Sequence, residues 1–392
     1  MPDVIGVVVV DDAPATARHA GGLPLPLRAL LALQQAGATE LAYAGAEADA
    51  WAELAMRDDR VRGPVAALNR APEGAFVAIA GGALVDTRFV RSLLRAPGVV
   101  RVGDSVAAVH RDASGGASVL DDGGLSALTT EGLCLPARTE GEVLAAEDAL
   151  FASLRKPQDG VVSRAINRAI SLRVTRLLAP TGLRPNQVSV GILALGVAAA
   201  VLAARGTHAS LALAGLLFNA QSILDGCDGE LARLTFRGSR AGEWIDTVGD
   251  DFTNYGYFAG AALGLHRAGL GALPLWVGGV GLAAGVTASL IEYRYLLAVG
   301  SGDLLKYPLG FGQDASGDRR DEGGLRGLLG LVRPAFKRDF FVFAAMLAAF
   351  AGPRATLGML CLFAGGALLT LGAVLRSEWA RRGVAPGEET KV

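Results

Sequence analysis

Cysteine, histidine and charge are all scarce in this chain of 392 residues. Its three cysteines are scattered without a C-x-x-C spacing, which argues against a disulfide framework and against a zinc site. None of the four histidines lies in a nucleophile motif, which argues against triad chemistry. Only 19% of the residues are charged and the net charge is −1, so electrostatics gives no reason to expect a nucleic-acid partner.

The chain is instead apolar, with 51% hydrophobic residues and a mean hydropathy of +0.38. Its N-terminus, MPDVIGVVVVDDA, lacks a basic region and a cleavage site, so we expect no signal peptide and a cytoplasmic location for residues 1–155. Charges are spread through those residues, whereas long uncharged stretches follow Pro185. We therefore expect four regions: a soluble domain (1–155), an interfacial helix and linker (156–184), a membrane domain (185–383) and a cytoplasmic tail (384–392).

The first 130 residues alternate between strand-like and helix-like patterns. Val4–Val10 is a continuous apolar run typical of a buried parallel strand. Further predicted elements are a helix at Leu25–Ala36, strands at Glu40–Ala44 and Ala75–Ala80, and a helix at Thr87–Leu94. This succession predicts a soluble, Rossmann-like α/β domain.

Six segments are apolar enough to suggest transmembrane helices, each of which needs about 20 residues. Four uncharged runs qualify directly: Pro185–Ala204, Gly206–Leu224, Ala268–Ile291 and Ala355–Leu375. Two shorter runs need their charged flanks to reach that length: Phe252–Leu265 and Phe340–Pro353. Buried helices of a soluble domain rarely provide so many such runs, and Gly327–Val332 is too short to span.

The positive charges of the loops predict the orientation of these helices. If residues 1–184 lie inside, the outer loops carry only Arg205, Arg267 and Arg354, and the inner loops carry the other loop arginines and lysines. Both termini are then cytoplasmic, and the chain is a multi-pass protein of the cell (inner) membrane.

A basic amphipathic helix is predicted at Val161–Leu178, just before the first span. One face is apolar: Val162, Ile166, Ile170, Val174, Leu177 and Leu178. Four arginines occupy the rest: Arg164, Arg168, Arg173 and Arg176. Such a helix is typical of the membrane interface. The alternative is a soluble helix packed on the N-terminal domain.

The segment from residue 224 to residue 251, LDGCDGELARLTFRGSRAGEWIDTVGDD, carries the candidate chemistry. Asp225 and Asp228 are three residues apart and share a helix face, whereas Gly242, Asp246 and Asp250 form a second stripe at intervals of four. Packing of these helices would bring four carboxylates together near a low-dielectric region, where they need cations. Hard divalent ions with oxygen ligands, Mg²⁺ or Mn²⁺, fit, and two would balance the four charges.

Neighbouring residues suit a phosphate-bearing ligand. Gly229 and Ala232 leave room for it against the helix, and Arg233 can neutralise phosphate oxygens. The following loop adds Arg237, Ser239 and Arg240. Asp251 lies about 100° off the acidic stripe and is expected to be solvated or a hydrogen-bond acceptor. The segment Lys337-Arg338-Asp339, before the fifth span, is expected to be an interfacial anchor or a lipid or acceptor phosphate contact.

The pattern D-x2-D-G-x2-A-R-x8-G-x3-D-x3-D resembles the motif of the CDP-alcohol phosphotransferase family at every fixed position, and the resemblance covers about residues 157–383. It implies six transmembrane helices, a homodimer formed through them, and release of CMP from a CDP-alcohol donor when an acceptor hydroxyl attacks. It implies that Asp225, Asp228, Asp246 and Asp250 hold two divalent metals and that Asp250 is also the general base. Implied contacts to the CDP moiety are Asn186, Ser189, Gly229, Ala232, Arg233, Ser239 and Gly242.

The order of elements in residues 1–130, with a helix and strand in Gly22–Tyr43 and a strand and helix in Phe76–Leu94, resembles that of sugar-phosphate nucleotidyltransferases. With the segment KPQDGVVSRAINRAIS at 156–171, the whole arrangement resembles archaeal bifunctional inositol-phosphate cytidylyltransferase/di-inositol-phosphate phosphate synthases. The active-site features of the first domain do not carry over. A Gly-rich phosphate loop and a lysine near Leu23–Arg28 are missing, and Gly81 and Gly82 stand where a metal-binding Asp is usual. Without them nucleotidyl transfer lacks electrostatic support, so we expect a noncatalytic domain with a structural, regulatory or partner-binding role.

The leading hypothesis is phospholipid synthesis from CDP-diacylglycerol. A second enzyme hypothesis is phosphoinositol transfer from CDP-inositol, with or without a cytidylyltransferase activity. A membrane scaffold would not need an intact motif. A metal-ion transporter would need acidic residues across the membrane, whereas these lie at one edge.

Overall fold

The computed structural model describes residues 4–112, 118–155, 162–308 and 338–382. The predicted tail (384–392), the run Gly327–Val332 and much of the inner loop between the fourth and fifth predicted spans lie outside these residues. The chain divides into two compact units. The first comprises Met1–Lys156, Arg176–Gly182 and Arg233–Arg237, and the second comprises Pro157–Thr175, Leu183–Ala232 and Gly238–Val392.

The first unit is built on a six-stranded sheet with the order β5-β4-β1-β6-β9-β8. These strands are β1 (Ile5–Val9), β4 (Glu40–Ala44), β5 (Val65–Leu68), β6 (Phe76–Ala80), β8 (Gly98–Val102) and β9 (Ser105–Arg111). Strands β1, β4, β5 and β6 are parallel, and β9 pairs antiparallel with β6 and β8. Short pairs form at the edges: β2 (His19–Ala20) with β3 (Leu23–Pro24), and β7 (Ala83–Val85) with β10 (Cys134–Pro136).

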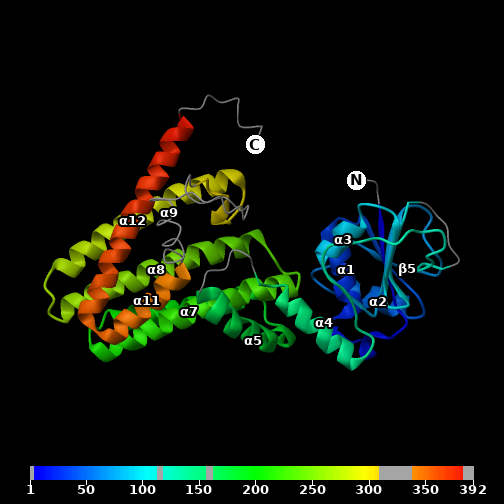
Figure 1. Ribbon diagram of the computed structural model, residues 1–392, viewed down its shortest axis with the longest axis horizontal. Coiled ribbons are helices and arrows are strands. Elements are labelled where there is room, and N and C mark those ends of the chain that lie inside the picture. Colours follow the sequence, from blue (N-terminus) through cyan, green and yellow to red (C-terminus); the bar gives the residue numbers. More distant parts are fainter. Residues whose placement is uncertain (1–3, 113–117, 156–161, 309–337, 383–392) are drawn as a thin grey trace, which may run out of the picture. The chain divides into compact units, whose positions relative to one another are not determined.

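Four helices complete this unit (Figure 1): α1 (Leu25–Ala36), α2 (Ala48–Met56), α3 (Thr87–Leu93) and α4 (Glu140–Ala152). Helix α3 begins where Asp86 accepts a hydrogen bond from the Phe89 backbone N–H at 2.8 Å. Helix α4 begins with a capping box between Thr139 and Glu142. Trp51 is fully buried in the core of this unit. The predicted strands and helices are thus confirmed, with ends shifted by at most one residue.

The second unit consists of long helices. They are α6 (Pro185–Ala203), α7 (His208–Leu234), α8 (Arg240–Arg267), α9 (Leu273–Val299), α11 (Arg338–Ala351) and α12 (Pro353–Arg382). Helix α9 packs against α8 and α12 (Figure 1). Among the described residues, α6, α9 and α12 are long and apolar enough to cross a membrane. Six helices therefore stand where six spans were expected, but only three of them meet that measure, because α7 and α8 carry the charged motif and α11 has 14 residues.

Small residues bring α6 and α8 into backbone contact. A Cβ added to Gly260 would lie 2.2 Å from the carbonyl oxygen of Ala200, and one added to Gly264 would lie 1.9 Å from that of Ala203. Any side chain at these two positions would force the helices apart.

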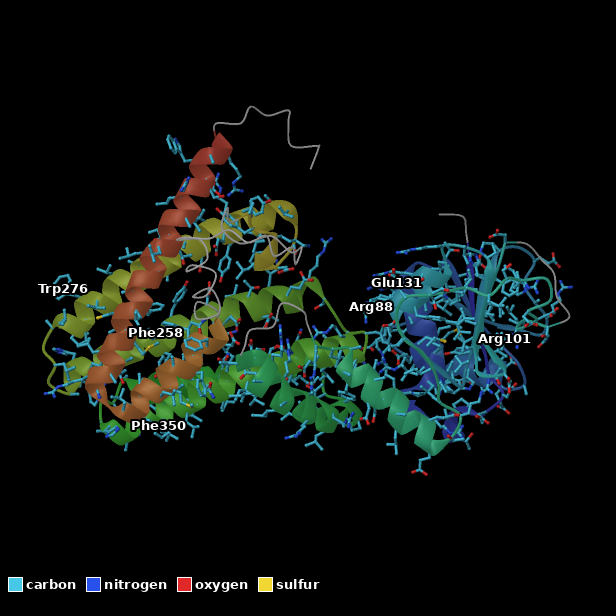
Figure 2. All side chains as sticks on the ribbon, in the orientation of Figure 1. Arg88, Arg101, Glu131, Phe258, Trp276 and Phe350 are labelled. Carbon is cyan, nitrogen blue, oxygen red and sulfur yellow. The ribbon has the colours of Figure 1, made fainter. Side chains whose placement is uncertain are left out.

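Large apolar side chains face outward from this unit (Figure 2). Trp276 on α9 is 74% exposed and Phe350 on α11 is also exposed, whereas Phe258 on α8 is buried and its ring stacks on that of Phe363 at 4.2 Å. An apolar exterior over long apolar helices is what a lipid environment requires.

The basic segment before the first span forms a turn of π-helix (Ser163–Asn167) and then α5 (Arg168–Leu178). Its expected faces are only partly right. Leu177 is 74% exposed, which fits an apolar face open to the surroundings, but Arg168 is buried rather than exposed. The reason is a buried carboxylate, Glu230, described below.

Candidate metal centre

Two helices supply the acidic residues of the motif. Asp225 and Asp228 lie on α7, and Asp246 and Asp250 lie on α8. Helix α8 begins at Ser239, whose hydroxyl accepts a hydrogen bond from the Gly242 backbone N–H at 3.0 Å. This cap fixes where the helix starts, and so fixes the positions of both its aspartates along the axis.

Three of the four aspartates converge. A carboxylate oxygen from each of Asp225, Asp246 and Asp250 can lie within 4.8 Å of the other two. Three carboxylates this close repel one another strongly in a helical, partly buried setting, so a cation between them is favoured. The Oδ1 atom of Asp250 is buried and has no hydrogen-bond partner among the described residues, which leaves it available as a ligand. An all-oxygen donor set of this kind fits Mg²⁺ or Mn²⁺.

Asp228 stands apart from this group of three. Its carboxylate accepts hydrogen bonds from the Ser189 hydroxyl and, at 2.6 Å, from the Gly229 backbone N–H. It nevertheless lines the same small cavity of about 40 Å³ as the other three aspartates. The geometry thus presents three converging carboxylates and a fourth at the cavity wall that is oriented by Ser189.

Arg338, at the start of α11, is a site residue that the sequence analysis assigned elsewhere. Its guanidinium forms ion pairs with Asp250 and, at 2.9 Å, with Asp225. It was expected to be a membrane anchor or a phosphate contact, because only its place before a span was visible. The structure instead places a permanent positive charge against two of the acidic residues.

The residues expected to contact CDP fall in several places. Asn186 and Ser189 lie in the first turns of α6, and a Cβ added to Gly242 would be 3.5 Å from the Asn186 side-chain oxygen. Asn186, Ser239 and Gly242 are therefore neighbours, and Ser189 contacts Asp228. Gly229 and Ala232 follow Asp228 on α7, whereas Arg233 belongs to the first unit.

Glu230, inside the motif, is fully buried and holds α5 against α7. Its carboxylate accepts hydrogen bonds from Arg168 at 2.6 Å, Ser171 at 2.8 Å and Thr175 at 2.6 Å. The three donors recur along one face of α5, and all are buried. This polar face was not predicted, because its partner is a residue at a variable position of the motif.

Asp251 faces away from the cluster of carboxylates and accepts hydrogen bonds from Ser289 and, at 2.7 Å, from Tyr293 on α9. Of its two expected roles, that of hydrogen-bond acceptor is confirmed. Asp251 lines a larger cavity of about 610 Å³, whose wall also includes Arg338, Ser289 and Glu292 and the apolar residue Phe363. Arg338 therefore lies at both the acidic cluster and this cavity.

Comparison with known proteins agrees with the motif. Residues 183–308 match the family model described as CDP-alcohol phosphatidyltransferase, so the resemblance expected from the motif is confirmed for that segment. The chain is similar to proteins named bifunctional IPC transferase and DIPP synthase. Identity is 44% over 101 residues for one from Thermococcus kodakarensis, covering 26% of this chain and 22% of the relative. For one from Archaeoglobus fulgidus it is 36% over 126 residues, covering 32% and 25%. The match thus spans about a quarter of the length of these relatives.

Among solved structures, the chain is similar to the phosphatidylinositol phosphate synthase of Mycobacterium tuberculosis with CDP-DAG bound. Sequence identity is 20%, the TM-score is 0.40, and 57% of this chain and 98% of that chain are covered.

Proposed function

We propose that this chain is a membrane-bound CDP-alcohol phosphotransferase. It would transfer a phosphatidyl or other phosphoalcohol group from a donor such as CDP-diacylglycerol to an acceptor hydroxyl, releasing CMP, in phospholipid synthesis. The observation that carries the proposal is the convergence of Asp225, Asp246 and Asp250 from two helices within a motif intact at every position. The family match over residues 183–308 supports the same reaction.

Divalent metal is the cofactor that these residues fit. Asp225, Asp246 and Asp250 would hold one Mg²⁺ or Mn²⁺, and Asp228, on the wall of the same cavity, would join them to hold a second. The bound ions would supply positive charge against the diphosphate of the donor.

The cytidine end of the donor would lie on the small and polar residues around the aspartates. We assign its contacts to Asn186, Ser189, Gly229, Ala232, Arg233, Ser239 and Gly242. Gly229 and Ala232 offer little side chain, so a ligand can approach the α7 backbone there. The guanidinium of Arg338 adds a cation at the boundary between the acidic cluster and the 610 Å³ cavity, where phosphate charge is to be neutralised.

Asp250 is the candidate general base. Its carboxylate would take the proton of the acceptor hydroxyl as that oxygen attacks the phosphorus distal to cytidine. A new phosphorus–oxygen bond then forms to the acceptor, and the bond from the same phosphorus to the bridging oxygen breaks. The electron pair leaves with that oxygen as CMP, and the acidic proton stays on Asp250 until solvent removes it.

We further propose the cellular setting. The chain would be a multi-pass protein of the inner membrane, with cytoplasmic N- and C-termini, α5 at the lipid interface, and a homodimer formed through the membrane domain (185–383). The domain of residues 1–155 would be noncatalytic. Gly81 and Gly82 follow β6, at the carboxyl end of a central parallel strand where a metal-binding side chain would be needed.

A second candidate donor is CDP-inositol. The similar proteins named bifunctional IPC transferase and DIPP synthase favour it. The chemistry at phosphorus and the roles of the aspartates would be the same, so only the donor and acceptor differ.

The test supplies the purified full-length protein with CDP-diacylglycerol or CDP-inositol, Mn²⁺ or Mg²⁺ and a panel of labelled alcohols. We expect CMP and one labelled product with one donor and not the other. Asp225→Asn should abolish formation of CMP and of the labelled product. Asp104→Asn, which changes an exposed residue of the first unit, should leave the formation of both unaltered. Metal-independent CMP release, or full activity in Asp225→Asn, would contradict the proposal.

A further inference from the structure

The connection between α7 and α8 contains an unusual backbone conformation. Phe236 has φ of +57°, and it is the one described residue other than glycine with positive φ. This conformation costs a non-glycine residue roughly 1–2 kcal/mol, so it persists only where surrounding contacts impose it. Phe236 belongs to the first unit, together with its neighbours from Arg233 to Arg237.

The first contact comes from Arg28 on α1. Its Nη2 atom donates a hydrogen bond to the carbonyl oxygen of Leu234 at 2.8 Å, and its guanidinium carbon lies 5.5 Å from the centre of the Phe236 ring. The same guanidinium donates to the carbonyl oxygens of Ala20, at 2.9 Å, and Gly21, at 3.3 Å. Arg28 therefore ties α1 and the β2–β3 turn to the connection.

Two further contacts hold the next residues. Arg60 donates to the carbonyl oxygen of Thr235 at 3.2 Å and is itself fixed by Asp58. Arg237 forms a two-pronged ion pair with Asp59, with distances of 2.8 Å and 3.3 Å. Together with Arg28, these residues contact each of the four consecutive residues from 234 to 237.

Burying the Arg28 guanidinium has a desolvation cost that a role in packing alone would not explain. It is 2% exposed and forms no ion pair among the described residues, so carbonyl oxygens are its main polar partners. Burial, and next the charge of Arg60, lower the pKa of Arg28 to about 10, with Glu147 opposing them. A leucine or methionine would fill the same space without that desolvation. The guanidinium fork is suited to fixing several carbonyl oxygens at once.

We propose that Arg28, Asp59 and Arg60 are positioning residues that hold the connection between α7 and α8 in the shape required for donor binding. This inference rests on the proposed function. The connection follows Arg233, in the last turn of α7, and leads to Ser239, and both residues are assigned above to the CDP moiety. The noncatalytic α/β domain thus contributes to the reaction by fixing the backbone between two donor contacts.

The test uses the full-length protein and the variants Arg28→Met, Arg28→Lys, Asp59→Asn and Phe236→Gly. The matched control is Arg57→Met, which removes an arginine whose ion pair with Glu53 is exposed. Steady-state rates are measured against donor and acceptor separately, with thermal unfolding of each variant. Trypsin cleavage after Arg233 and Arg237 reports the order of the connection without any turnover.

We expect Arg28→Met to raise the KM for the donor by about 10- to 100-fold, the range for loss of a hydrogen bond to a charged group. Its KM for the acceptor should stay within twofold, and trypsin should cleave the connection faster. Arg28→Lys should recover part of the donor KM. Phe236→Gly should also raise the donor KM, because it removes the ring that Arg28 contacts and frees the backbone to leave the positive φ.

Two results would overturn the proposal. One is an unchanged donor KM in Arg28→Met and Phe236→Gly. The other is a lower unfolding temperature in Arg28→Met with the donor KM and tryptic cleavage unaltered, which would make Arg28 a packing residue only. If the unaltered protein releases no CMP from any donor, the proposed function fails by itself. Equal tryptic cleavage of all variants would then independently show that Arg28, Asp59 and Arg60 do not hold the connection.

Discussion

Replacing Glu230 by Gln removes the carboxylate that accepts hydrogen bonds from Arg168, Ser171 and Thr175 of α5. Arg168 would then stay buried after losing its ion pair with Glu230, while Ser171 and Thr175 could still donate to the amide oxygen. Breaking a buried pair by neutralising one partner costs about 3–5 kcal/mol. If that cost falls on the association of α5 with α7, transient separation of the two helices becomes more frequent by roughly two to three and a half orders of magnitude.

Cys227 provides the assay. It is fully buried on α7, and its thiol donates to the Ser171 carbonyl oxygen of α5 at 3.6 Å, so a maleimide reaches it only when α5 moves away. With Cys134 and Cys361 replaced by Ala, the labelling rate of Cys227 reports this opening. We expect it to rise at least about 100-fold in Glu230→Gln, in proportion to the open population.

The matched control is Asp148→Asn, which breaks the ion pair that Asp148 forms with Arg176 near the end of α5. Both side chains are exposed, so the pair contributes at most about 1 kcal/mol and labelling should change by no more than about fivefold. A double change, Arg168→Met with Glu230→Leu, should return labelling toward the reference rate because no charge stays buried. Labelling of Glu230→Gln at the reference rate would refute the role of this carboxylate.

Three other predictions follow from the site and the first unit. Asp225→Asn and Asp246→Asn should each weaken Mn²⁺ binding by at least about tenfold, measured by electron paramagnetic resonance without substrate; unaltered binding would reject the cluster. Asp250→Asn should retain the donor but slow single turnovers by about 10²–10⁴-fold, unless Asp250 is only a ligand, in which case high Mn²⁺ restores the rate. Burial favours the neutral form of Asp58, but hydrogen bonds from Arg60 outweigh it and lower the pKa of Asp58. The stabilisation from this pair should therefore be complete at neutral pH and disappear as the pH falls below the ordinary Asp range, so Asp58→Asn should flatten the acid limb of the unfolding curve.

Local pattern was enough to predict much of the architecture. Strand β1 and helix α1 follow from continuous and periodic apolar residues, and the spacing of Asp246 and Asp250 follows from the helical repeat. These features depend on residues within one or two turns of each other. The three-way convergence with Asp225 required only that two neighbouring helices pack together.

The polar pairs between residues far apart in the chain could not be predicted from the sequence. Arg338 lies 88 residues from Asp250, and no pattern within α11 indicates that its charge turns toward the carboxylates. The inner face of α5 was misread for a similar reason, since its arginine at position 168 looks solvent-facing until Glu230 is known to be its partner. The contacts that hold residues 234–237 likewise depend on Arg28, more than 200 positions away.

The glycine contacts between α6 and α8 affect how the protein responds to its bilayer. With Gly260 and Gly264 against the carbonyl oxygens of α6, the two helices cannot slide or rotate past each other without collision. A thicker or thinner hydrocarbon layer would therefore tilt the two helices together as one rigid body, at a cost of fractions of a kcal/mol per Å of mismatch. Asp246 and Asp250 lie on α8 and would move with this rigid body, so their spacing would be the same in lipids of short and long acyl chains.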